Sequence, residues 1–178
     1  TKKSLGSAAM VEQVENADLI KVSGCKNPKA VTILLRGSTE YLLDELERAV
    51  VDGTRVVEDA MEDGKLLVGG GAVETELLMK LHEYAGTVGG RVQLAIEAYA
   101  ASFEIIPTTL AENSGFNQLD KLVELKAAHA KGKKHAGLNV YTGKIIDMFK
   151  EGVVEPHRSK RQSIQSSAEA AVLLLRVD

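Results

Sequence analysis

The sequence predicts a mainly α-helical fold with small β elements, an α+β protein overall. Several segments place apolar residues three and four positions apart, the spacing of one helix face, whereas stretches rich in β-branched residues are short. Aromatic residues make up 4% of the 178 residues and there is no Trp, so the core has to be built from aliphatic side chains and Ala. Such a core favours packed helices over a β-sandwich.

The first predicted elements are two strands and a long helix. The strands are expected at Asp18 to Ser23 and at Ala30 to Arg36, and the second, rich in β-branched residues, is expected to be buried. Ser38 or Thr39 then provides a helix cap, and the helix is expected to end at Gly64. Its apolar positions share one stripe, made of Leu42, Leu46, Ala49, Val50, Gly53, Val56, Val57 and Ala60.

Further helices follow a glycine-rich junction. An apolar run at Leu66 to Val68 leads into three consecutive glycines and a helix from about Ala72 to Ala85. The next helix, Val92 to Ile106, carries apolar residues on two sides and is therefore expected to be buried. Pro107 either ends this helix or opens the next turn of helix, and another helix is expected at Gln118 to Lys131.

The last predicted elements are a hairpin and a C-terminal helix. Strands at Leu138 to Tyr141 and Lys144 to Met148 are expected to meet around the turn Thr142-Gly143. Pro156 is expected to open the final helix. The expected buried stripe of this helix consists of Ile164, Ala168, Ala171, Val172 and Leu175.

Composition and charge exclude several classes of protein. The net charge of -3 provides no basic field that would attract nucleic acid or an anionic membrane. Cys25 is the only cysteine, so no intrachain disulfide forms, and a structural thiol is expected rather than a nucleophile. The longest apolar run, Ala170 to Leu175, is far below the roughly 20 residues of a membrane span. We therefore expect a soluble, cytoplasmic chain, and its start at Thr1 suggests a piece of a longer protein.

The three glycines Gly69, Gly70 and Gly71 form the first candidate site. They lie between an apolar run and a predicted helix start, where backbone N–H groups without neighbouring side chains can approach a phosphate group closely. The spacing matches neither a Walker loop nor the dinucleotide-binding motif. A tight turn between strand and helix explains the same residues, and both interpretations remain open.

Asp52 is the second candidate, because Gly53 follows it inside the long helix. Glycine in a helix costs about 1 kcal/mol relative to Ala, and such a local inconsistency is typical of places where function overrides propensity. A carboxylate at the edge of the apolar stripe could orient a water molecule or bind a cation. The alternative is an ordinary solvated aspartate.

The remaining polar groups carry weaker signals. The four histidines have no metal-ligand spacing, which argues against a metal site: His82, His129, His135 and His157. The basic clusters Lys131 to His135 and His157 to Arg161 contain no aromatic residues between the charges, so we expect solvated faces or subunit contacts rather than nucleic-acid sites. Glu155-Pro156 lies at a helix start, where it forms either a cap region or a polar contact to a ligand.

The residues from Gly24 to Gly37 resemble the strand that leaves the apical domain of group II chaperonins, the archaeal thermosome and its eukaryotic cytosolic relatives in the TCP-1/chaperonin-60 superfamily. The resemblance continues in order over nearly the whole chain, at Glu62–Gly64, Gly69–Ala72, Gln93–Ala98, Leu110–Gly115, Tyr141–Gly143, Glu155-Pro156 and Gln165–Ala171. These chaperonins form two rings and use ATP to enclose and fold unfolded proteins. The chain resembles the C-terminal third of such a subunit.

The resemblance implies three domain pieces: residues 1–25 from the apical domain, 26–64 from the intermediate domain, and 65–178 from the equatorial helical bundle. It also implies a role for each candidate residue. Asp52 would position the water that attacks ATP, and Gly70, flanked by Gly69 and Gly71, would approach the nucleotide through its backbone. Gly137 would lie near the adenine and Glu155 at the ribose.

The family's phosphate-binding Gly-Asp-Gly-Thr-Thr loop, which carries the Mg²⁺ ligand, has no match in this sequence. ATP or ADP with Mg²⁺ is therefore expected in the complete subunit, with no metal ligand in this chain. The isolated chain is expected neither to hydrolyse ATP nor to fold clients. The alternative is a stand-alone structural or interaction module that keeps the equatorial scaffold without ATPase chemistry. Expected partners are other subunits of the ring and unfolded proteins, with neither nucleic acid nor membrane.

Overall fold

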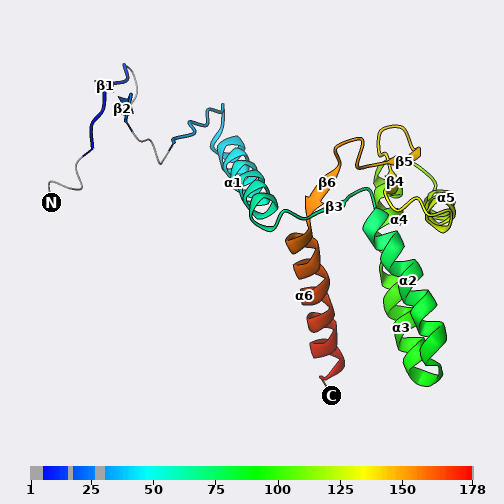
Figure 1. Ribbon diagram of the computed structural model, residues 1–178. Helices are drawn as coiled ribbons and strands as arrows, with labels where there is room; N and C mark the ends of the chain where they lie inside the picture. The colour runs from blue at the N-terminus through cyan, green and yellow to red at the C-terminus, as the bar shows by residue number, and fades with distance from the viewer. Residues whose placement is uncertain (1–5, 16–17, 27–30, 178) are drawn as a thin grey trace. The chain divides into compact units, whose positions relative to one another are not determined.

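The computed structural model describes residues 6–15, 18–26 and 31–177 of the chain (Figure 1). The chain divides into two units, residues 1–49 and residues 50–178. Helices dominate, and the described strands form three two-stranded antiparallel sheets, which confirms the predicted mainly α fold with small β elements. None of the helices in the described ranges is long and apolar enough to cross a membrane.

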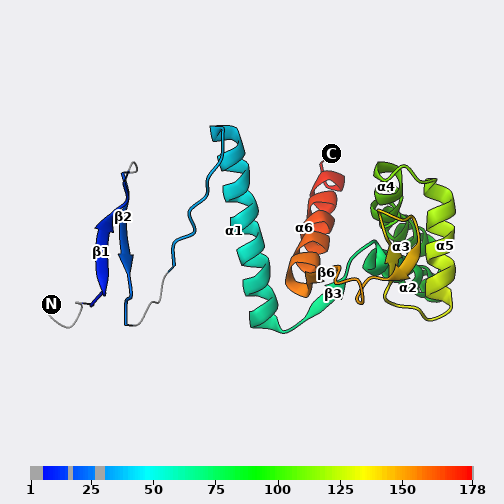
Figure 2. The ribbon, with the colours of Figure 1, turned by 90° about the horizontal axis from the view of Figure 1, so that it is seen from above.

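The first unit contains a short hairpin. Strand β1 (Met10–Gln13) pairs with β2 (Ile20–Ser23), and Met10 lies opposite Ser23 (Figure 2). Strand β2 confirms the predicted strand at residues 18–23, with a start two residues later, whereas β1 is not among the predicted strands.

The predicted buried strand at Ala30 to Arg36 is wrong over its described part, residues 31–36. This stretch has no regular secondary structure, and Val31 is 87% exposed and Ile33 60% exposed. A strand is stabilised by hydrogen bonds to a neighbouring strand, and none of the described strands pairs with these residues. Their β-branched composition favours an extended backbone but does not supply a partner. Ala30 itself lies outside the described residues.

Helix α1 (Glu40–Asp63) begins in the first unit and ends in the second. Thr39 is its cap, because Thr39 Oγ1 accepts a hydrogen bond from the Leu42 N–H at 3.2 Å. The predicted end at Gly64 is confirmed: this residue has a φ of +59°, and its N–H donates to the Ala60 carbonyl at 3.0 Å. No residue of α1 is buried, so its apolar stripe lies on the surface of the described chain.

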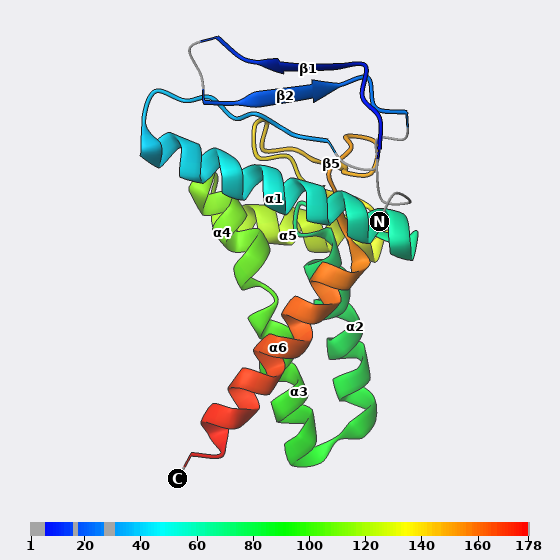
Figure 3. The same cartoon turned by 90° about the vertical axis from the view of Figure 1, so that its left-hand side faces the viewer.

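Two pairs of helices follow in the second unit. Helices α2 (Ala72–Val88) and α3 (Gly90–Ser102) lie side by side, and α4 (Ile105–Asn113) packs against α5 (Gln118–Ala130) (Figure 3). Helix α2 confirms the predicted helix at 72–85 and extends three residues further. Helix α5 confirms the predicted helix at 118–131.

The predicted single helix from Val92 to Ile106 is wrong, because α3 ends at Ser102 and α4 begins at Ile105. In a continuous helix, Pro107 could not donate to the carbonyl of Phe103 and its ring would press against that carbonyl. In the structure Pro107 lies in the first turn of α4, where no such donor is needed. Burial on both sides is also wrong: of the residues in α3, Ala100 alone is buried, and Leu94 is 66% exposed.

The second unit also contains two small sheets. Strand β3 (Leu66–Val68) pairs with β6 (Val154–Pro156), and β4 (Ala136–Leu138) pairs with β5 (Ile145–Asp147). The second pair confirms a hairpin with its second strand inside the predicted range, but the first strand begins two residues earlier than predicted and shares only Leu138 with the predicted strand, so the turn is longer. The buried core lies between α2, α5 and this hairpin, with Leu78, Leu125, Leu138 and Met148 each 2% exposed or less.

Helix α6 (His157–Leu175) begins directly after Pro156, which confirms its predicted start. The predicted buried stripe of this helix is wrong within the described chain. No residue of α6 is buried, and Leu175 is 84% exposed. The stripe has the spacing of a buried face, but α6 packs mainly against the short strand β6.

Candidate functional site

The three glycines connect strand β3 to helix α2 and are held from both sides. On the strand side, the Gly69 N–H donates to the Val153 carbonyl at 3.0 Å and so extends the pairing of β3 with β6. On the helix side, the Gly71 carbonyl accepts from the Thr75 N–H at 3.1 Å and from the Thr75 hydroxyl at 2.8 Å. The loop is therefore held at both ends by hydrogen bonds that its own backbone groups make.

Strand β4 packs against this loop backbone to backbone. The Leu138 N–H donates to the Gly70 carbonyl at 2.8 Å, and Gly70 has a φ of +68°. A Cβ on Gly70 would lie 3.1 Å from Leu138 N, and a Cβ on Gly137 would lie 2.8 Å from Gly69 O and 2.6 Å from Met148 Cγ. Both positions therefore require glycine for internal packing, because protein atoms fill the space of the missing side chains.

The same loop also presents unpaired donors. Within the described residues, no hydrogen bond is found from the N–H groups of Gly70, Gly71 and Val73. These groups lie at the start of the 17-residue helix α2, where the helix dipole favours negative charge. The tight turn and the phosphate-binding interpretation are thus compatible. Protein atoms fill the space where side chains on these glycines would lie, but their backbone N–H groups remain available to a ligand.

A chain of three charged groups lies beside the start of α2. The Lys160 ammonium is 2.5 Å from Glu74 Oε1 and 3.0 Å from Glu155 Oε1. Burial lowers the pKa of Lys160, but the hydrogen bonds to Glu74 and Glu155 outweigh it, so the pKa is raised above its ordinary value. Glu74 is 4% exposed, and Glu155 lies opposite Leu67 in the β3–β6 pair.

The structure brings five of the six candidate residues into one region. Gly69 and Gly70 contact the strand that carries Gly137, Gly71 follows them in the same loop, and Lys160 connects Glu155 to the first turn of α2. Asp52 is not brought to them. It is exposed on α1, eleven residues before Asp63 or about 16 Å along the helix axis. Within the described ranges its carboxylate makes no hydrogen bond or ion pair.

The helix that carries Asp52 is tied to α6 at its far end. The Arg158 guanidinium donates to Asp59 Oδ1 at 2.9 Å, to Glu62 Oε2 at 3.1 Å, and to both carboxylate oxygens of Asp63. The hydrogen bonds to Asp63 and Glu62 raise the pKa of Arg158. Gly64 follows directly, so the link lies at the junction of α1 with β3.

The sequence does not indicate the roles of the two basic residues in these ion pairs. Arg158 and Lys160 belong to the cluster expected to be a solvated face or a subunit contact. Arg158 is exposed, as expected for a solvated face, whereas Lys160 is partly buried, and the ion pairs of both residues are not predicted. Apart from Glu155, which precedes Lys160 in the same segment, their partners are 86 to 99 residues away, and no local pattern indicates such pairs.

The position of His129 in the sequence does not indicate its structural role either. Its side chain is buried, with Nδ1 2.9 Å from Glu76 Oε2 and Nε2 2.8 Å from the Ala136 carbonyl. It therefore joins α2, α5 and the start of β4, the strand that carries Gly137.

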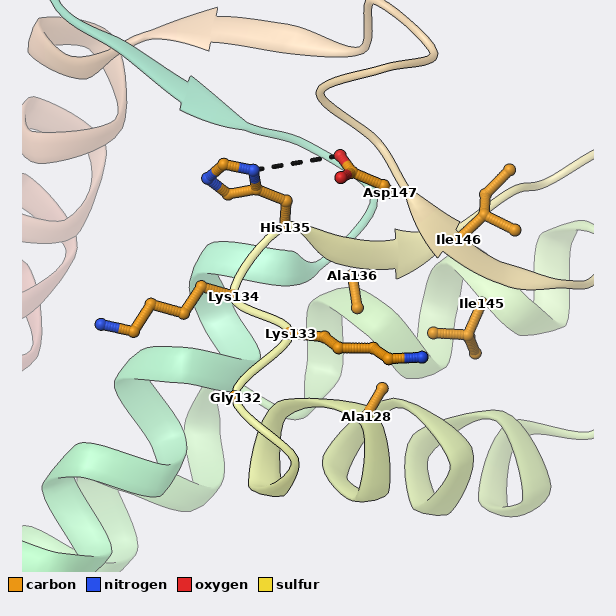
Figure 4. Close-up of a pocket in the computed structure, with 9 residues that line it drawn as sticks. All are labelled: Ala128, Gly132, Lys133, Lys134, His135, Ala136, Ile145, Ile146 and Asp147. Atoms are coloured by element: carbon orange, nitrogen blue, oxygen red, sulfur yellow. Dashed lines mark ion pairs between the residues drawn. The ribbon is translucent and has the colours of Figure 1, made fainter.

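A hollow of about 640 Å³ lies elsewhere, between the end of α5 and the β4–β5 hairpin (Figure 4). The Lys133 side chain extends over Ala128 and toward Ile145, and His135 Nδ1 lies 3.9 Å from Asp147 Oδ1. None of the six candidate residues lines it. In the part of the chain that the structure describes, no group of three or more His, Cys, Asp or Glu side chains could hold a metal ion.

Comparisons with known proteins agree on one family. The model of the TCP-1/cpn60 chaperonin family matches residues 1–178. Over the whole chain, the sequence is 54% identical to thermosome subunit beta of Archaeoglobus fulgidus and 52% identical to a thermosome subunit of Pyrococcus abyssi. In both cases the chain spans 33% of the relative's length.

A solved structure shows the same fold. The open-state monomer of a group II chaperonin from Methanococcoides burtonii has 48% sequence identity and a TM-score of 0.71, and the match covers 94% of this chain and 42% of that one. The family model and the identities near 50% extend over nearly every residue, including the glycine loop, the hairpin and α1. The chain therefore belongs to the TCP-1/cpn60 chaperonin family, in its group II branch.

Proposed function

We propose that the chain is part of a cytoplasmic group II chaperonin subunit that binds and hydrolyses ATP to drive the enclosure and folding of unfolded proteins in a double ring. The observation that carries this proposal is the glycine loop at the start of α2, with free N–H groups and with Glu155 beside it. The thermosome relatives support the subunit role. Because the chain spans a third of their length, the activity is a property of the complete subunit.

The nucleotide would contact this chain mainly through backbone. The N–H groups of Gly70 and Gly71 suit phosphate oxygens, since both lie at a helix start without a protein acceptor in the described region. Gly137 lies in the strand next to this loop and would face the adenine. Glu155 has its Oε1 directed to Lys160, which leaves Oε2 for a ribose hydroxyl. Mg²⁺ would neutralise phosphate charge and would be held by residues outside this chain.

Asp52 would act as the group that orients the attacking water. Because it is exposed and away from the glycines, this role requires α1 to change its position relative to the loop. Two features make α1 suited to such a movement. Gly64 ends the helix with a left-handed φ, and residues 64–65 alone separate α1 from β3.

Asp52→Asn in the complete subunit tests the proposal. We expect ATP turnover to fall about 10²-fold or more, the usual contribution of a positioned acid–base group. The Kd for ATP should change less than about threefold, since the phosphate and ribose contacts lie on other elements. Asp44→Asn is the matched control, because Asp44 is another exposed aspartate of α1. Unchanged turnover in Asp52→Asn would remove this residue from the mechanism.

A further inference from the structure

Lys160 lies between two carboxylates that differ strongly in exposure. The side chain of Glu74 is 5% exposed, that of Lys160 is 20% exposed, and that of Glu155 is 31% exposed. The three side chains come from α2, α6 and β6 and form one connected row from the interior toward the solvent. The row therefore has a fixed inner end and an accessible outer end.

The inner end fixes the lysine. A nearly buried carboxylate needs a charged partner, because an unpaired charge in the interior is costly. Glu74 meets this need with Lys160 at 2.5 Å, so the lysine is held in place. The ammonium has three donors, and a second one is directed to Glu155.

The outer end is held in turn by the lysine. The backbone of Glu155 is fixed by its pairing with Leu67, and its Oε1 lies 3.0 Å from the ammonium. With backbone and Oε1 both held, the direction of Oε2 is also set. Without the ammonium, the partly exposed carboxylate would be free to turn toward water.

We propose that Lys160 is a positioning residue that holds the Glu155 carboxylate for the hydroxyl groups of a bound ribonucleotide, and so sets the preference for ribose over deoxyribose. This proposal rests on the proposed function, because it requires Glu155 to contact the ribose. A carboxylate rejects a ligand that lacks the hydroxyl only when it is held where the hydroxyl would be. Lys160 acts through Glu155 and does not itself contact the nucleotide.

Charge and position have different effects on binding. Removing Lys160 leaves two uncompensated carboxylates near the anionic nucleotide, which weakens ribonucleotides and deoxyribonucleotides equally. If the Glu155 carboxylate is no longer held in place, the binding of the ribonucleotide alone is weakened. The ratio of the two Kd values therefore reports the positioning role separately from the charge.

The experiment measures the Kd of ADP and of 2′-deoxy-ADP for the complete subunit by calorimetry. The unmodified protein should favour ADP by about tenfold or more, as expected for a hydrogen bond to a charged group. Lys160→Met and Glu155→Gln should both reduce the preference to less than about threefold. Lys160→Arg, which keeps charge and donors, should retain most of it. Glu74→Gln should reduce it in part and serves if Lys160→Met does not fold.

Lys126→Met is the matched control, because Lys126 forms a 2.6 Å ion pair with Glu104 away from the site. Its preference for ADP should equal that of the unmodified protein. If Glu155→Gln keeps the full preference, the ribose contact of the proposed function fails. If Glu155→Gln loses the preference while Lys160→Met and Glu74→Gln keep it, the positioning role of Lys160 alone is overturned. Equal weakening of both ligands by Lys160→Met would also overturn it.

Discussion

Gly137→Ala is the substitution with the most direct structural consequence. A Cβ at this position would lie 2.6 Å from Met148 Cγ, 2.8 Å from Gly69 O and 3.1 Å from Gly70 O. Two of these three atoms are backbone oxygens of the glycine loop. The Met148 side chain can move, but the loop is held by the hydrogen bond from Gly69 N–H to Val153 O at 3.0 Å.

The expected cost follows from these contacts. Overpacking a closed site costs typically 1–3 kcal/mol, and because the neighbours are mainly backbone we expect about 2–3 kcal/mol for Gly137→Ala. The strand relieves the contact by separating from the loop, which breaks the hydrogen bond from the Leu138 N–H to the Gly70 carbonyl. At 1.4 kcal/mol per tenfold change, local opening increases about 30- to 150-fold.

Hydrogen exchange of the hairpin measures this opening in the complete subunit. Peptides that contain Leu138 should exchange faster by that factor, and the Kd for ATP should rise. The control is Gly86→Ala, because Gly86 lies inside α2 with no atom within 4 Å of a built Cβ. It should leave the hairpin unchanged and stabilise α2 by about 0.5–1 kcal/mol. Unchanged exchange in Gly137→Ala would refute the close packing of strand and loop.

Three further predictions concern the polar contacts around the site. His129→Leu leaves Glu76 and the Ala136 carbonyl without their partner, and it should lower the free energy of unfolding by about 1–3 kcal/mol in denaturant titrations. Arg158→Met should speed hydrogen exchange in the last turn of α1, and high salt should do the same to the unmodified protein, because this exposed cluster is screened. Lys160 has a folded pKa raised above 10.5, so its contribution to stability is complete below pH 10.5 and is lost as pH rises through the folded value. Melting curves of Lys160→Met and unmodified protein should therefore differ by a constant amount from pH 7 to pH 9 and converge at more alkaline pH.

Local chemistry accounts for the parts of the fold that the sequence predicts well. Thr39 caps α1, Gly64 ends it and Pro156 precedes α6, and each of these signals depends on residues within one helical turn. The proline break between α3 and α4 is also local, but the start of α4 two residues before Pro107 depends on where the first turn of a helix tolerates proline.

The sequence predicts part of the candidate site, because it indicates the glycine loop but not the ion pairs beside it. The glycines indicate a place where backbone must come close to something, and in the structure that partner is first of all the chain itself, at Leu138 and Met148. The ion pairs of Arg158 and the ion pair of Lys160 with Glu74 cannot be predicted from the sequence, because opposite charges 86 to 99 residues apart have no characteristic spacing.

The two wrong predictions of helix burial have one physical cause. The stripes of α3 and α6 have the period of a buried helix face, yet Leu94 is 66% exposed and Leu175 is 84% exposed in this chain. Contiguous apolar surface in water is typical of a face that another element covers. The chain spans a third of the thermosome subunits it matches, so most of a related subunit lies outside it. We expect the corresponding part of the subunit to bury the apolar stripes of α3 and α6, because removing apolar side chains from water is favourable.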